Sequence, residues 1–151
     1  MPFEESVGYQ VRATHRVLQR YLQLKIEPYG VTLGMWYFLR ALWDEDGLTQ
    51  RELSRRVGTT EPTTLTALLS MERSGLIRRL QSSEDRRRMH VFLTSKGRNL
   101  KAKLMPLARS VVATAVQGFS APEARALLAA LVGVQRNIQT SLSQFDESRL
   151  V

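Results

Sequence analysis

The spacing of apolar residues divides the first third of the chain into two helices. Apolar residues recur at steps of three and four from Glu4 to Glu27, which predicts a first helix over that range. The proline and glycine of "EPYGVT" end it. Thr32 stands where its side chain can cap a second helix, "LGMWYFLRALWDE", which ends at Gly47.

Two further helices are predicted from their start signals. "TQRE" fits a capping box, with Thr49 as N-cap and Glu52 at the third helical position, for a short helix over about residues 50–57. After "GTTEPTT" a fourth helix runs to about Ser74, with Pro62 early in it, where a missing N–H costs nothing. A short helix, a turn and a second helix form a helix-turn-helix.

The hydrophobic period then changes to two. "LIRRLQ" and "RMHVFL" are strand-like, and "SSEDRR" joins them as a hairpin loop. Alternate residues of the second strand share a face, with Met89, Val91 and Leu93 on one side and Arg88, His90 and Phe92 on the other. A basic hairpin directly after a helix-turn-helix predicts a winged helix.

Two long helices complete the predicted order. Thr94 or Ser95 caps a fifth helix that runs to about Gln117, and "SAPE" gives a second capping box for a sixth helix from about Pro122 to Phe145. The expected fold is mainly α, an α+β winged helix with six helices and a two-stranded β-hairpin wing. The apolar stripes of the first and last helices need more surface than a small winged helix offers, although a monomer with a long-helix scaffold is an alternative.

The charge points to a polyanion. Lys and Arg number 22 against 14 Asp and Glu, so the formal net charge is +8, and most of the excess is arginine, which suits bidentate contact with phosphate. Residues 78–101 hold eight basic and two acidic side chains, which is three-quarters of the excess. Nucleic acid is therefore the first partner to consider, and the alternative is a merely basic protein.

Other classes fit poorly. The chain has no cysteine, which excludes disulfides, thiolate metal sites and thiol-based sensing. "GTTEPTT" lacks the Gly-Lys-Ser/Thr ending of a phosphate loop, no catalytic constellation stands out, and two histidines make a zinc site a poor expectation, so we expect no enzyme, cofactor or metal. "MPFEESVGYQ" has no apolar signal-peptide region and no apolar run approaches about 20 residues, so we expect a cytoplasmic protein without membrane contact.

The ordered set of motifs resembles the MarR family of bacterial transcriptional regulators. "LTQRELSRRVG" resembles the family's first helix of the helix-turn-helix, "MERSGLIRR" the end of its recognition helix, "SEDRRRMHVFLTSKGR" its wing, and "FSAPEARALLAAL" its last helix. The resemblance implies a homodimer in which residues 1–31 and 95–151 supply the dimerisation helices. Residues 32–94 would form the winged helix-turn-helix within one intertwined domain.

The resemblance makes the fourth helix the recognition helix, whose N-terminal residues face base edges in the major groove. The candidates are Thr59, Thr60, Glu61, Pro62, Thr63 and Thr66. The chain departs from the family pattern here, because no arginine lies between Arg56 and Arg73 and the strongest guanine reader is missing. The threonines fit apolar contacts to thymine methyls, or merely capping and solvent exposure.

In the wing, Asp85 and Arg87 match the family's Asp-x-Arg. The resemblance implies that Asp85 positions Arg87 and that Arg87 enters the minor groove, where narrow A·T tracts strengthen the negative potential. We expect Arg86 and Arg88 to meet phosphates. Three arginines before the recognition helix are either DNA-backbone clamps or an ordinary exposed face: Arg51, Arg55 and Arg56.

The resemblance also implies a small-molecule effector, often an aromatic or phenolic acid. The candidate pocket residues are His15, Arg16, Trp36, Tyr37 and Arg40, since aromatic walls with cationic groups suit an aromatic carboxylate, although core or interface packing explains them equally.

The expected function is a homodimeric repressor of a pseudo-palindromic double-stranded operator with half-sites roughly 10 base pairs apart. The alternative is a non-sensing architectural or protein-interaction winged helix.

Overall fold

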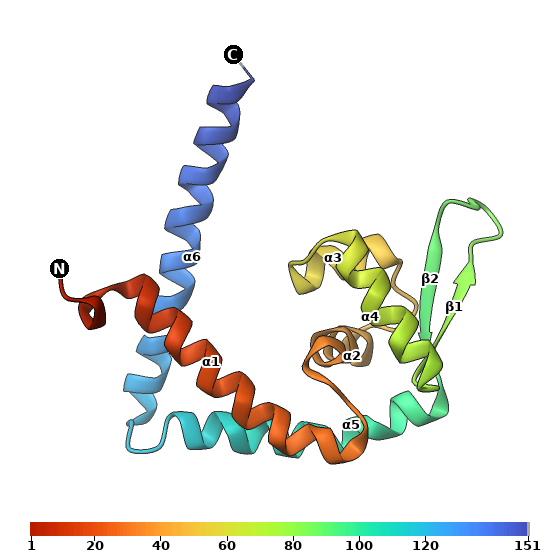
Figure 1. Cartoon of the computed structure of the whole chain (residues 1–151), viewed down its shortest axis with the longest axis horizontal. Helices are drawn as coiled ribbons and strands as arrows, with labels where there is room; N and C mark the ends of the chain where they lie inside the picture. The colour runs from red at the N-terminus through yellow and green to blue at the C-terminus, as the bar shows by residue number, and fades with distance from the viewer. Residues whose placement is uncertain (151) are drawn as a thin grey trace. The chain divides into compact units, whose positions relative to one another are not determined.

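The computed structural model describes residues 1–150 and confirms the mainly helical order with a two-stranded hairpin. Its elements are η1 Phe3–Glu5, α1 Val7–Ile26, η2 Glu27–Tyr29, α2 Leu33–Asp44, α3 Gln50–Val57, α4 Glu61–Arg73, β1 Ile77–Gln81, β2 Met89–Leu93, α5 Ser95–Ala115 and α6 Ala121–Arg149 (Figure 1). The two η elements are short 3-10 helices.

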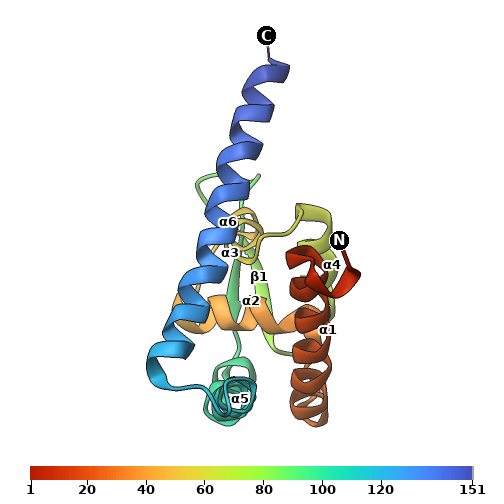
Figure 2. The same cartoon turned by 90° about the vertical axis from the view of Figure 1, so that its left-hand side faces the viewer.

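The chain divides into two units, residues 1–112 and the residues from 113 onward. The core of the first unit is one apolar cluster, in which α2 supplies Trp36 and Leu39, α3 supplies Leu53, α4 supplies Leu68 and β2 supplies Val91. The second unit contains the continuous helix α6 (Figure 2), and none of residues 121–149 is buried.

Local side-chain bonds determine the start of the helix-turn-helix. Thr49 Oγ1 accepts the Glu52 N–H at 3.1 Å, and the Glu52 carboxylate accepts the Thr49 N–H at 2.9 Å, so the predicted capping box is confirmed. Between α3 and α4, the buried hydroxyls of Ser54 and Thr64 lie 2.7 Å apart. Because an unpaired buried hydroxyl is costly, this pair favours one packing of the two helices.

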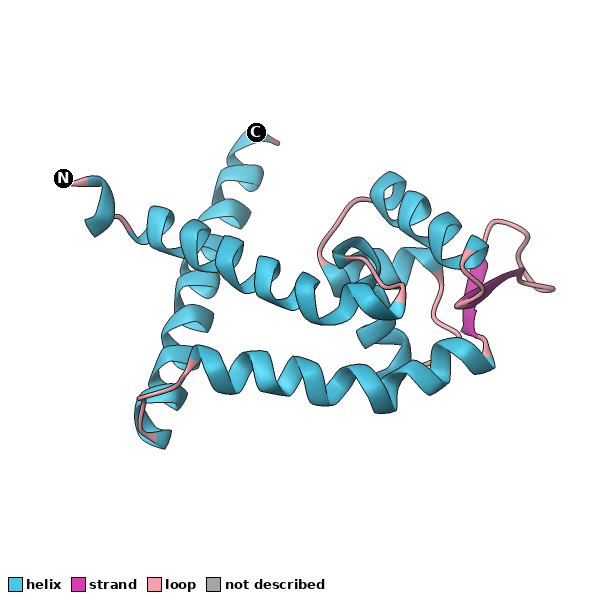
Figure 3. Cartoon of the chain, turned by 60° about the horizontal axis from the view of Figure 1, so that its bottom comes forward, coloured by secondary structure: helices cyan, strands magenta, loops and turns pink. Residues whose placement is uncertain are grey.

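The wing is an antiparallel hairpin whose register pairs Ile77 with Leu93 and Gln81 with Met89. It lies beside α4, and its loop projects beyond the strands (Figure 3). A bridge between Thr49 and His90, which the sequence pattern does not signal, adds a third backbone segment to β2. The residues before α3 therefore tie the wing to the helix-turn-helix.

Several predicted helix ends are wrong. The first helix begins at Val7 instead of Glu4, because Ser6 is extended and its Oγ accepts the Tyr9 N–H at 3.4 Å, a cap that competes with continued helix. Thr32 occupies the N-cap of α2, but its side chain makes no capping bond, and its backbone carbonyl accepts the Met35 N–H instead.

The last two helices also differ from the predicted ends. α5 ends at Ala115 instead of Gln117, because i→i+3 hydrogen bonds tighten the chain before Gly118, whose φ is +86°. The capping box that starts α6 is confirmed. The hydrogen bonds that Glu123 makes with the backbone and side chain of Ser120 lower the pKa of the Glu123 carboxyl. α6 continues past the predicted Phe145 to Arg149.

The start of α5 is positioned by two contacts with the residues before the wing. Thr94 Oγ1 accepts the Gly97 N–H at 3.1 Å, so Thr94 and not Ser95 is the N-cap, and it also donates to the Gly75 carbonyl. Gly97 is buried, and a Cβ there would collide with the Leu76 carbonyl oxygen. Only glycine lets α5 approach the base of the wing this closely.

Candidate nucleic-acid interface

The N-terminus of α4 presents a row of exposed threonines. Thr60 caps the helix by accepting the Thr63 N–H at 3.3 Å, and its own hydroxyl donates to Thr63 Oγ1 at 2.9 Å. Thr66 donates to the Pro62 carbonyl at 3.1 Å. The predicted residues Thr60, Glu61, Pro62, Thr63 and Thr66 are exposed and Thr59 is half-buried. The structure therefore places all six on or beside the first two turns of α4.

The tip of the wing is a turn that carries arginines and is ordered by contacts of Asp85. Asp85 Oδ1 accepts the Arg87 N–H at 3.0 Å and lies 3.5 Å from the Arg87 Nε, while the other carboxylate oxygen lies 3.8 Å from the Arg88 Nε. The Arg87 side chain is 94% exposed. Asp85 thus orders the backbone at Arg87 and leaves its guanidinium in solvent, while Arg86 and Arg88 are exposed beside it.

Three basic residues at the base of the wing form hydrogen bonds with the protein itself. Arg79 donates to Gln50 Oε1 at 3.0 Å, lies 3.5 Å from the Glu72 carboxylate, and is only 18% exposed. Lys96 Nζ donates to the Ser74 carbonyl and Arg98 to the Leu93 carbonyl, both at 2.9 Å. All three belong to the basic run of residues 78–101, and their internal contacts were not predictable from the sequence.

The arginines of α3 do not form a uniform group. Arg51 and Arg55 are exposed, and their side chains make no hydrogen bond or ion pair within residues 1–150. Arg56 instead pairs with Glu45, the residue that follows α2. Of the three candidate clamps, two have free guanidinium groups and the third has an acidic partner of its own.

A small pocket of about 170 Å³ lies between α1, α2 and α5. Four of the five predicted effector residues line it, namely His15, Trp36, Tyr37 and Arg40. Trp36 is at the same time part of the core, where its ring meets Trp43 edge-on at 5.8 Å and Arg40 lies 5.9 Å from its centre. Arg16 is not among the lining residues, because the α1 residues that line the pocket, namely His15, Leu18, Gln19 and Leu22, share one face of the helix and Arg16 lies beyond the edge of that face.

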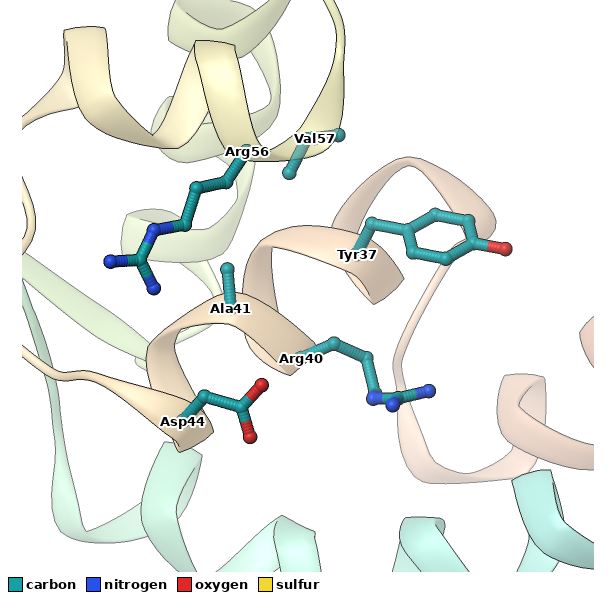
Figure 4. Close-up of a pocket in the computed structure, with 6 residues that line it drawn as sticks. All are labelled: Tyr37, Arg40, Ala41, Asp44, Arg56 and Val57. Atoms are coloured by element: carbon teal, nitrogen blue, oxygen red, sulfur yellow. The ribbon is translucent and has the colours of Figure 1, made fainter. Parts of the chain in front are cut away.

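A second, more open pocket of about 380 Å³ lies between α2 and α3. Figure 4 shows Arg40 and Arg56 extending in different directions around it, with the Asp44 carboxylate on the α2 side. Tyr37 and Arg40 line both pockets, so the same turn of α2 faces each of them. The sequence offered no signal for this second pocket, because Arg56 and Val57 enter it from a separate helix.

The fold of this chain is shared with known proteins. The crystal structure of a MarR transcriptional regulator from Methanosarcina mazei superposes with a TM-score of 0.81, is 30% identical, and covers 89% of this chain and 96% of that one. The sequence model of the MarR family matches residues 31–89. This chain belongs to the MarR family.

Two further proteins are similar over most of the chain. The HTH-type transcriptional regulator TtmR of Methylorubrum extorquens is 32% identical over 83% of this chain, and the match spans 63% of TtmR. The MepR–DNA complex of S. aureus superposes with a TM-score of 0.82 at 25% identity, over 87% of this chain and 98% of that one. The MarR family consists of transcriptional regulators, and no helix within residues 1–150 of this member is both long and apolar enough to cross a membrane.

Proposed function

We propose that this MarR-family regulator is a homodimeric repressor that binds a pseudo-palindromic operator in the cytoplasm and is released by a small aromatic acid. The observation that carries the proposal is the difference between the arginines at the tip of the wing and those at its base. The Arg87 side chain is 94% exposed at the tip, where Asp85 lies 3.5 Å from its Nε, while Arg79 and Arg98 donate hydrogen bonds to the protein at the base. A narrow minor groove attracts such an exposed guanidinium, and phosphates on either side accept Arg86 and Arg88.

The exposed N-terminal turns of α4 are the second element of the proposed interface. The motif places the start of such a helix against base edges in the major groove. Arg51 and Arg55 on α3 would hold the backbone, whereas Arg56 first has to leave Glu45. We therefore assign Arg51 and Arg55, and not Arg56, as the backbone clamps of this helix-turn-helix.

The proposal of a homodimer is supported by the apolar face of α6. Large apolar side chains recur along it at steps of three and four, and each is at least 39% exposed: Leu127, Leu131, Val134, Ile138, Leu142 and Phe145. The helix α1 separately exposes apolar residues of its own, such as Val7, Val11 and Leu24. Monomers rarely leave so long an apolar row in water, so a second copy of the chain is its proposed cover.

The proposed effector site is the pocket between α1, α2 and α5. Arg40 supplies a cation for a carboxylate, and Trp36 and Tyr37 supply aromatic walls. At about 170 Å³ the pocket is small, which favours a single-ring acid over a larger ligand. A bound acid there would touch both the long helices and the winged helix, so it can alter how the two wings are spaced.

The test is a titration of the purified protein on its own upstream intergenic DNA and on scrambled DNA of equal length, at two salt concentrations. We expect a preference of roughly a thousandfold that survives the higher salt. Benzoate-like acids, added to the same assay, should release the operator, and Arg40→Met should abolish that release without changing the affinity for DNA.

Equal affinity for both duplexes that disappears with salt would favour the alternative, a non-sensing architectural protein. A reporter gene placed behind the operator decides the direction of regulation. Repression requires that expression rises when the gene for the protein is deleted, and a fall would instead identify an activator.

A further inference from the structure

The outward face of α4 has an unusual chemical character for a helix that reads DNA. Thr59 to Glu72 contain no lysine or arginine, and Glu61, at the first helical position, can only accept hydrogen bonds. Guanine presents two acceptors in the major groove and is read best by a bidentate cation. This face therefore lacks the group that would recognise guanine.

The hydroxyls of the exposed threonines are largely used within the helix. Thr60 accepts the Thr63 N–H and donates its own proton to Thr63 Oγ1 at 2.9 Å. Thr66 donates its proton to the Pro62 carbonyl at 3.1 Å. A proton that is already donated is not available to a base, so the Thr60 and Thr66 hydroxyls can only accept hydrogen bonds, and the methyl groups of these threonines and the Pro62 ring are the apolar groups of this surface.

One apolar group lies in the major groove of unmodified DNA, the C5 methyl of thymine. Cytosine lacks it. We propose that α4 reads thymine C5 methyl groups through the methyls of Thr60 and Thr66 and the Pro62 ring, so that each operator half-site is selected by shape and apolar contact. This inference rests on the proposed function, since it takes α4 to be the reading helix of an operator.

The first arm of the test alters the DNA alone. Deoxyuridine in place of thymidine removes the C5 methyl and leaves the base pairing, the minor-groove edge and the phosphates unchanged. At each contacted thymine we expect the Kd to rise roughly fourfold, which corresponds to one buried methyl, and roughly fifteenfold when both symmetric positions are changed. The control duplex carries the same number of deoxyuridines outside the contacted half-site positions.

The second arm alters one atom of the protein at a time. Thr66→Val keeps a methyl and removes the hydroxyl, whereas Thr66→Ser keeps the hydroxyl and removes the methyl. Thr66→Val should retain the discrimination between thymidine and deoxyuridine, and Thr66→Ser should reduce it. Thermal melting of both variants confirms that each is folded.

The outcomes separate this inference from the proposed function. Specific binding that is unchanged by deoxyuridine, or that Thr66→Val loses and Thr66→Ser keeps, overturns the reading of methyl groups and leaves the operator-binding regulator intact. A protein that prefers no duplex at all overturns both.

Discussion

The tip and the base of the wing contain the same residue type in opposite situations. At the tip, Arg87 is 94% exposed, and its neighbour Asp85 binds its backbone N–H. At the base, Arg79 is 18% exposed and connects β1 to Gln50 on α3 and to Glu72 on α4. Only the turn of the hairpin separates these two arginines along the chain.

Under the proposed function, the difference means that a count of charges along the sequence overstates the number of cationic side chains free to contact DNA. The basic run from 78 to 101 carries eight cationic side chains, and three of them, Arg79, Lys96 and Arg98, donate to groups of the protein itself. The cations at the base hold the wing at a defined position, and the cations at the tip are those that we propose bind DNA. Substitutions at each end of the wing test this division.

The largest effect is expected at the tip. Arg87→Ala should raise the Kd for the operator by about thirtyfold or more, because a groove contact contributes about 1–3 kcal/mol and the dimer has two wings. Arg98→Ala removes the same charge at the base and should weaken binding less. Fluorescence anisotropy with one operator measures both, and equal losses would show that the tip has no special role.

The next largest effect is expected at the base, and on folding. Arg79→Met should lower the free energy of unfolding by about 1–2 kcal/mol, since it removes the hydrogen bond to Gln50 and the ion pair with Glu72 while keeping most of the apolar stem, and Glu72 is partly screened by solvent. Denaturant unfolding measures this change. Arg79→Lys keeps the charge but not the planar guanidinium, so it should recover only part of the lost stability. Full stability in both variants would contradict a stabilising role for the contacts of Arg79 with Gln50 and Glu72.

A smaller effect should separate two roles of Asp85. Asp85→Asn keeps an acceptor for the Arg87 N–H and loses the charge, whereas Asp85→Ala loses both. If the turn positions Arg87, the alanine variant should bind the operator a further three- to tenfold more weakly than the asparagine variant, or about 1 kcal/mol. Indistinguishable affinities would mean that the turn holds its shape without this bond.

The smallest effect is expected in the salt dependence. Arg86→Ala should reduce the slope of log Kd against log salt by about one for each phosphate that the variant no longer neutralises. Lys96→Met, at the base, should leave that slope unchanged because its ammonium donates to the Ser74 carbonyl. A slope that falls equally in both variants would place the base of the wing on DNA as well.

The sequence by itself determined the features that depend on neighbours a few residues apart. The capping boxes of Thr49 with Glu52 and of Ser120 with Glu123 were predictable because each is closed within one helical turn. The alternation of Val91 and Leu93 with Phe92 likewise predicted the two faces of β2, and the structure buries Val91 and Leu93 while Phe92 is exposed. Where two local signals competed, as at Ser6, the predicted end was wrong by a few residues.

Tertiary structure decided which polar side chains are free. The partners of Arg79 and His90 lie 29 and 43 residues away in the chain, at Gln50 and Gly47, and Arg16 lies outside the pocket that receives its neighbour His15. No periodicity encodes such pairs, because a hydrogen bond depends on distances that exist only after α3, α4 and the wing have packed. The sequence therefore determined the elements and the excess of arginine, and packing decided which arginines remain available to a partner.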